Sequence, residues 1–83
     1  MKVKTITLEG QTGYTATISR DEKSIVCHIA DNTGNCVNIH HVSPIDRDDQ
    51  LSMAQCIQYQ LDGCRGTNSM IHDYLRLISL LAD

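Results

Sequence analysis

The chain has few aromatic and few positively charged residues. Its 83 residues include three tyrosines but no phenylalanine or tryptophan, so a buried core has to be built from aliphatic side chains. Seven Lys and Arg against ten Asp and Glu give a formal net charge of −3. The cations are scattered along the chain and form no basic stripe, which argues against binding along a nucleic-acid backbone. We therefore expect no nucleic-acid partner.

Long apolar runs are also missing. No stretch approaches the roughly 20 apolar residues of a membrane helix, and polar residues between positions 5 and 11 interrupt the run that a signal peptide requires. We expect no membrane partner and a cytoplasmic protein, in which the four cysteines stay reduced. Cys27 and Cys56 fall at positions that the apolar pattern predicts to be buried, and Cys64, in a glycine-rich loop, is expected to be reactive.

Two periodicities divide the chain. Alternating polar and apolar residues predict strands over residues 2–9, 14–20, 24–30 and 35–42. Ser43 as N-cap and Pro44 at the first helical position predict a helix to residue 61 or 62, followed by Gly63. A second helix begins after Thr67 or Asn68. The prediction is one α+β domain, residues 1–83, with a four-stranded antiparallel meander (1–42) covered on one face by a C-terminal helical hairpin (43–83).

The register of the last two strands can be argued from their connection. A three-residue loop over 32–34, with Gly34 in the left-handed conformation, sets Ile29 opposite Val37 and Cys27 opposite Ile39. This register gives one apolar face toward the helices. It leaves an outer face of threonines, serines and histidines with almost no formal charge, which either reflects the strand propensity of threonine or meets a partner.

The last helix has more apolar surface than one buried face needs. Its apolar side chains cover an arc of about 220°, whereas a core-facing stripe needs little more than about 100°. A chain of this size is marginally stable on its own, so we expect a homodimer or another protein to cover the surplus. The expected interface combines this helix with the threonine face: Met70, Tyr74, Leu77, Leu80, Leu81, Thr15 and Thr17.

One set of side chains suggests metal chemistry. In the predicted register His28, Cys36 and His40 project from the same outer face, close enough to share a zinc ion. Their spacing matches no established zinc pattern, so the alternative is two exposed histidines beside a thiol. Nothing in the sequence shapes a pocket around a nucleophile and a base. We therefore expect neither an enzyme nor a bound cofactor.

Association is thus the main functional prediction. The sequence indicates a small acidic protein–protein interaction module, a homodimer that acts by binding and inhibiting another protein. Its layout is similar to that of small accessory and inhibitor proteins of phages and other mobile elements, although no motif residue carries that resemblance. The alternative function is a zinc-binding regulatory protein that uses His28, Cys36 and His40.

Overall fold

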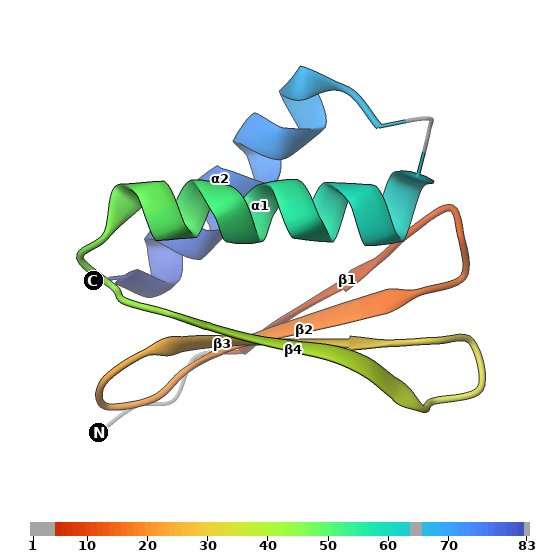
Figure 1. The fold of residues 1–83 in the computed structure, drawn as a ribbon, viewed down its shortest axis with the longest axis horizontal. Coiled ribbons are helices and arrows are strands. Elements are labelled where there is room, and N and C mark those ends of the chain that lie inside the picture. Colours follow the sequence, from red (N-terminus) through yellow and green to blue (C-terminus); the bar gives the residue numbers. More distant parts are fainter. Residues whose placement is uncertain (1–4, 64–65, 83) are drawn as a thin grey trace.

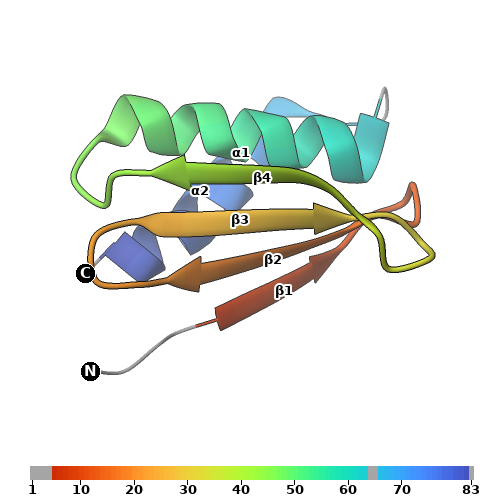
Figure 2. The same cartoon turned by 60° about the horizontal axis from the view of Figure 1, so that its bottom comes forward.

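The computed structural model describes residues 5–63 and 66–82. Four strands precede two helices (Figure 1): β1 (Thr5–Glu9), β2 (Thr15–Arg20), β3 (Ile25–Ala30), β4 (Cys36–Val42), α1 (Arg47–Asp62) and α2 (Asn68–Ala82). All pairings are antiparallel and the strand order is β1-β2-β3-β4. Both helices lie on the same side of the sheet (Figures 1 and 2). The predicted α+β meander with two C-terminal helices over one face is confirmed.

The core is aliphatic, as the shortage of aromatic residues requires. α1 packs against β2, β3 and β4, and α2 packs against β2, β3 and α1. Burying these apolar side chains between sheet and helices is the main contribution to stability. The buried apolar residues are Ala16, Ile18, Ile25, Cys27, Ile29, Val42, Met53, Ala54, Ile57, Leu61, Ile78 and Leu81.

The predicted loop between β3 and β4 is confirmed, but the predicted register is wrong. Gly34 has a φ of +91°, and the Asp31 amide donates to the Asn35 carbonyl at 2.9 Å, which closes a three-residue loop. A β-bulge then shifts the pairing between β3 and β4 by one residue, so Ile29 faces Asn38.

Because side chains alternate along a strand, this one-residue shift turns the rest of β4 over. Cys27 is opposite His40 rather than Ile39, and Ile25 is opposite Val42. Val37 and Ile39, which were expected in the core, are 48% and 49% exposed.

The first helix begins later than predicted. Residues 43–46 form a turn in which the Asp46 amide donates to the Ser43 carbonyl at 3.4 Å. Asp46 is the N-cap, and its carboxylate accepts from the amides of Asp48 and Asp49. A carboxylate at this position pairs with two free amides and also interacts favourably with the helix dipole, so it displaces Ser43 as the cap.

The end of the first helix and the start of the second agree with the prediction. Gly63 follows α1 with a φ of +58°, and its amide donates to the Tyr59 carbonyl. Thr67 precedes α2 and accepts from the Met70 amide through its side chain at 3.3 Å.

The turn between β1 and β2 closes the C-terminal end of α1, a contact that the sequence did not indicate. The Thr12 hydroxyl donates to the carbonyls of Gln60 and Leu61, at 2.8 and 3.0 Å, and the Thr12 amide donates to Leu61 at 3.1 Å. Gly10 lies so close that a Cβ there would be 2.2 Å from the Leu61 oxygen. The hairpin therefore satisfies carbonyls that the end of a helix leaves unpaired.

Candidate interaction surfaces

The three residues of the predicted zinc site do not come together. His28 lies opposite Ile39 and is exposed, whereas His40 lies opposite Cys27 and its ring contacts Cys56 of α1. The bulge thus separates His28 and His40 onto opposite faces of the sheet. Cys36 lies opposite Ala30, next to the bulge, and is exposed. Within residues 5–63 and 66–82, no group of three His, Cys, Asp or Glu side chains is placed to hold a metal ion.

His40 instead belongs to a polar cluster between β4 and α1. Its Nε2 atom lies 3.2 Å from Cys56 Sγ and 3.2 Å from Asn38 Nδ2. Asn38 also donates to Cys56 Sγ at 3.7 Å. These contacts give hydrogen-bond partners to two polar side chains that the bulge turns toward the helix, where unpaired polar groups would be costly.

The thiols of this region are held in their neutral form. Burial raises the pKa of Cys56. Burial, and secondarily the nearby Cys56, raises the pKa of Cys27 to about 12. Because the thiolate is the nucleophilic form, neither thiol is activated for attack at neutral pH. Cys27 is buried as predicted and Cys56 is partly exposed. Cys64 lies outside the described residues.

The outer face of the sheet, on the side away from both helices, is nearly uncharged. Strand pairing arranges it in three rows across the sheet. Its described members are Thr5, Ser19, Val26 and His41 in one row, Thr7, Thr17, His28 and Ile39 in the next, and Glu9, Thr15, Ala30 and Cys36 in the third. Glu9 is its one formally charged side chain in the described part when histidine is neutral. The bulge makes this face more apolar than predicted, because Ile39 replaces Asn38.

The last helix uses much of its apolar surface inside the chain. Ile78 and Leu81 are buried, so Leu81, predicted to be at an interface, belongs to the core. The ring of Tyr74 packs beside the core, and its hydroxyl donates to Asp62 Oδ2 of α1 at 2.6 Å. Of the predicted interface residues on α2, Leu80 stays 57% exposed, and Met70 and Leu77 are half-buried. The apolar surplus is therefore smaller than the sequence suggested.

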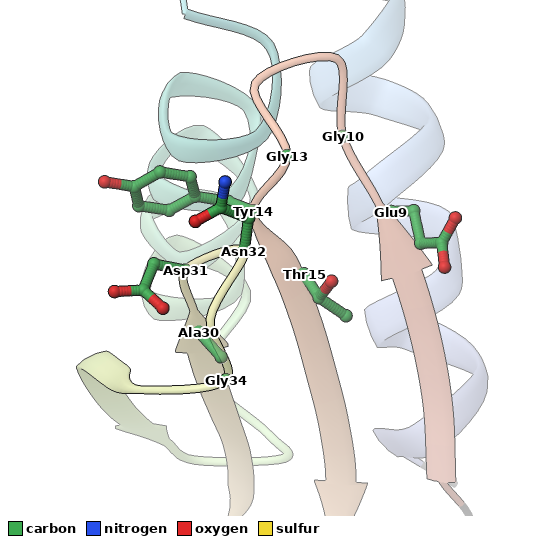
Figure 3. Close-up of a pocket in the computed structure, with 9 residues that line it drawn as sticks. All are labelled: Glu9, Gly10, Gly13, Tyr14, Thr15, Ala30, Asp31, Asn32 and Gly34. Carbon is green, nitrogen blue, oxygen red and sulfur yellow. The ribbon is translucent and has the colours of Figure 1, made fainter.

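A hollow of about 490 Å³ lies between the β1–β2 and β3–β4 turns (Figure 3). Its two acidic residues do not converge: Figure 3 shows Glu9 on one side and Asp31 on the other, each pointing away from the centre. The Asp31 carboxylate is already used by its own loop, where it accepts from the amides of Thr33 and Asn35 at 2.9 and 3.0 Å. The Thr33 hydroxyl also donates to this carboxylate at 2.6 Å. That hydrogen bond is the largest cause of the lowered pKa of Asp31, and the backbone amides add to it. Neither carboxylate is therefore directed into the hollow.

A second hollow, of about 540 Å³, lies where the start of α1 meets the last turns of α2. Its rim includes Ile45, which is 90% exposed, and Leu80. Arg47 and Arg76 both line it. It therefore combines apolar and cationic groups from residues that are distant in sequence.

No protein-family model, curated protein or solved structure matches this chain. In the part of the chain that the structure describes, neither helix has the length and apolar character needed to cross a membrane.

Proposed function

We propose that this chain is a small acidic protein–protein interaction module that forms a homodimer through the outer face of its sheet. The observation that carries the proposal is the composition of that face. Both helices cover the opposite side, so three rows of threonine, serine, histidine and aliphatic side chains remain uncovered. A sheet face that meets water usually carries polar side chains, charged ones among them, and among the described residues of this face Glu9 alone is formally charged when histidine is neutral.

A second copy of the chain fits this face better than a charged partner does. Two copies that each carry a net charge of −3 repel one another, and the repulsion is least where the contact itself is uncharged. A sheet face can also meet its own copy about a two-fold axis, with its central row contacting the same row of the partner. The row of Thr7, Thr17, His28 and Ile39 lies at the centre of such a contact.

The dimensions of the face indicate a moderate affinity. Four strands about 4.8 Å apart and about 20 Å long present on the order of 400 Å² in projection. Stable interfaces bury about 800 Å² of accessible surface from each partner. The dimer is therefore expected to dissociate on dilution rather than to be permanent.

A dimer formed through the sheet leaves the helical side of the molecule accessible to a different protein. Leu80 and Ile45 are exposed on the helical side of the molecule, so a dimer formed through the sheet leaves them accessible. Binding and inhibition of a second protein at this side complete the proposed function.

A matched pair of variants tests the dimer. Thr17→Lys places a charge in the central row of the outer face, and Gln55→Lys makes the same change in net charge at an exposed position of α1. Light scattering after gel filtration at high protein concentration should show a monomer for Thr17→Lys and a dimer for Gln55→Lys and wild type. A Thr17→Lys variant that dimerises as well as wild type would contradict the proposal.

A further inference from the structure

The hollow between α1 and α2 has the chemistry of a binding groove. It continues into a neighbouring hollow lined by His72, and Arg47, Arg76 and Ser79 line both. Two of the seven Lys and Arg residues in this acidic chain thus line the same groove. Guanidinium groups are well suited to bind carboxylates with paired hydrogen bonds.

A buried amide beneath the groove provides an independent observation. Gln50 is 1% exposed and lines the hollow. Its Nε2 atom donates to the Ser43 carbonyl at 3.2 Å, but its Oε1 atom has no hydrogen-bond partner among the described residues. A buried acceptor without a donor is unfavourable, so the groove favours a ligand that brings an N–H or O–H group.

The charges around the groove restrict the kind of ligand. Asp46 and Asp48 line an adjoining hollow together with Ile45 and Arg47. A chain of phosphates crossing this region would meet those carboxylates and be repelled. A single carboxylate can bind the two arginines without crossing the acidic residues, and an apolar side chain next to it can cover Ile45 and Leu80.

We propose that this groove binds an acidic peptide segment of a partner protein. A Glu or Asp carboxylate of that segment accepts from Arg47 and Arg76, a backbone N–H donates to Gln50 Oε1, and a neighbouring leucine-like side chain packs on Ile45 and Leu80. The inference rests on the proposed interaction function and specifies its partner by chemistry.

The test is a titration of the full-length, ¹⁵N-labelled protein followed by two-dimensional NMR. The probe is the capped peptide acetyl-Glu-Leu-Glu-Leu-amide, and its neutral counterpart is acetyl-Gln-Leu-Gln-Leu-amide. We expect saturable shifts at the Gln50 side-chain amide, Ser79 and Leu80 with the acidic peptide only. Arg76→Gln should weaken binding at least about tenfold, equivalent to ~1.4 kcal/mol. Lys23→Gln, which removes the same charge from the exposed β2–β3 turn, should leave the affinity unchanged.

Gln50→Met provides a second variant, which should weaken binding several-fold. Equal binding of the two peptides, unchanged affinity in Arg76→Gln, or no saturable shift at about 5 mM peptide would overturn the proposal. So would tighter binding of a thymidine decanucleotide at the same residues, which would indicate a nucleic-acid ligand.

The same titration on Thr17→Lys separates the two proposals. Peptide binding to a monomeric variant supports the groove whatever the state of the dimer. A dimeric wild type that binds no peptide contradicts the groove alone, and a monomeric wild type that binds the peptide contradicts the dimer alone.

Discussion

The hydroxyl of Tyr74 holds α2 against the C-terminal end of α1, and removing it is a direct test of how the helical layer is fixed. It donates to Asp62 Oδ2 at 2.6 Å, and Asp62 is only 5% exposed. Tyr74→Phe keeps the ring, which packs beside the core, and removes only the donor. The Asp62 carboxylate then loses a hydrogen bond in a place that water reaches poorly.

The structure allows the size of this effect to be estimated. A hydrogen bond to a charged group contributes about 1.5–3 kcal/mol, so we expect Tyr74→Phe to lower the free energy of unfolding by about 2 kcal/mol. In a domain of this size each kcal/mol changes Tm by roughly 4–8 °C, which predicts a fall of roughly 8–16 °C. The ring position should not change, because the aromatic packing is retained.

Urea denaturation followed by circular dichroism measures the difference. All variants are compared at one protein concentration, because a dimer adds a concentration-dependent term to the stability. Tyr59→Phe is the matched control: Tyr59 is 69% exposed, so the same chemical change should alter stability by less than about 0.5 kcal/mol. Equal unfolding free energies for Tyr74→Phe and Tyr59→Phe would refute the role assigned to the Tyr74–Asp62 hydrogen bond.

Two further predictions concern the core thiol and the helix cap. The pKa of Cys27 is raised from 9.0 to about 12 in the folded chain, so its neutral thiol contributes fully to the free energy of unfolding below pH 9. This contribution is lost as the pH rises from 9 to 12, and the loss is roughly 1.4 kcal/mol at pH 10. Urea titrations from pH 8 to 10 should show this loss in wild type and in the exposed-thiol control Cys36→Ala. The loss should be smaller in Cys27→Ala, which keeps only the part due to groups such as Cys56, whose pKa is also raised, and identical slopes in all three would count against the role of Cys27. Asp46→Ala should lower the stability by about 1 kcal/mol and Ser43→Ala by less, because Asp46 caps α1; thermal unfolding would show the reverse order if Ser43 were the cap.

The sequence was sufficient to predict the elements and their layers. Residues alternate along β2, and Ala16 and Ile18 are buried as this alternation predicts. The helical periodicity over α2 is a local pattern of the same kind, and neither depends on how the elements pack. The loop over residues 32–34 was also predictable, because Gly34 provides the left-handed conformation that a three-residue connection needs.

The bulge in β4 could not be predicted from such patterns. The expected register buried Val37 and Ile39, which is the better choice when one strand pair is considered alone. The observed register is compatible with α1 because Cys56 lies where it contacts His40. That contact joins residues 16 positions apart, and its existence depends on how the helix crosses the sheet.

The same limit applies to the candidate sites. His28 and His40 seemed to share a face only because the bulge was not foreseen. The groove joins Gln50 near the start of α1 to Arg76 and Leu80 near the end of α2, so it exists only once the two helices pack. The unpaired oxygen of Gln50 has no signal in the sequence, because a glutamine in the first turns of a helix is ordinarily exposed.

Sedimentation equilibrium of the wild-type chain over a wide concentration series tests the central claim, that a second copy covers the outer face of the sheet. The proposal predicts an average mass that rises from that of the monomer, 9.3 kDa, toward twice that value as the concentration increases. A mass that stays at 9.3 kDa throughout the series would contradict it and leave the threonine rows facing solvent.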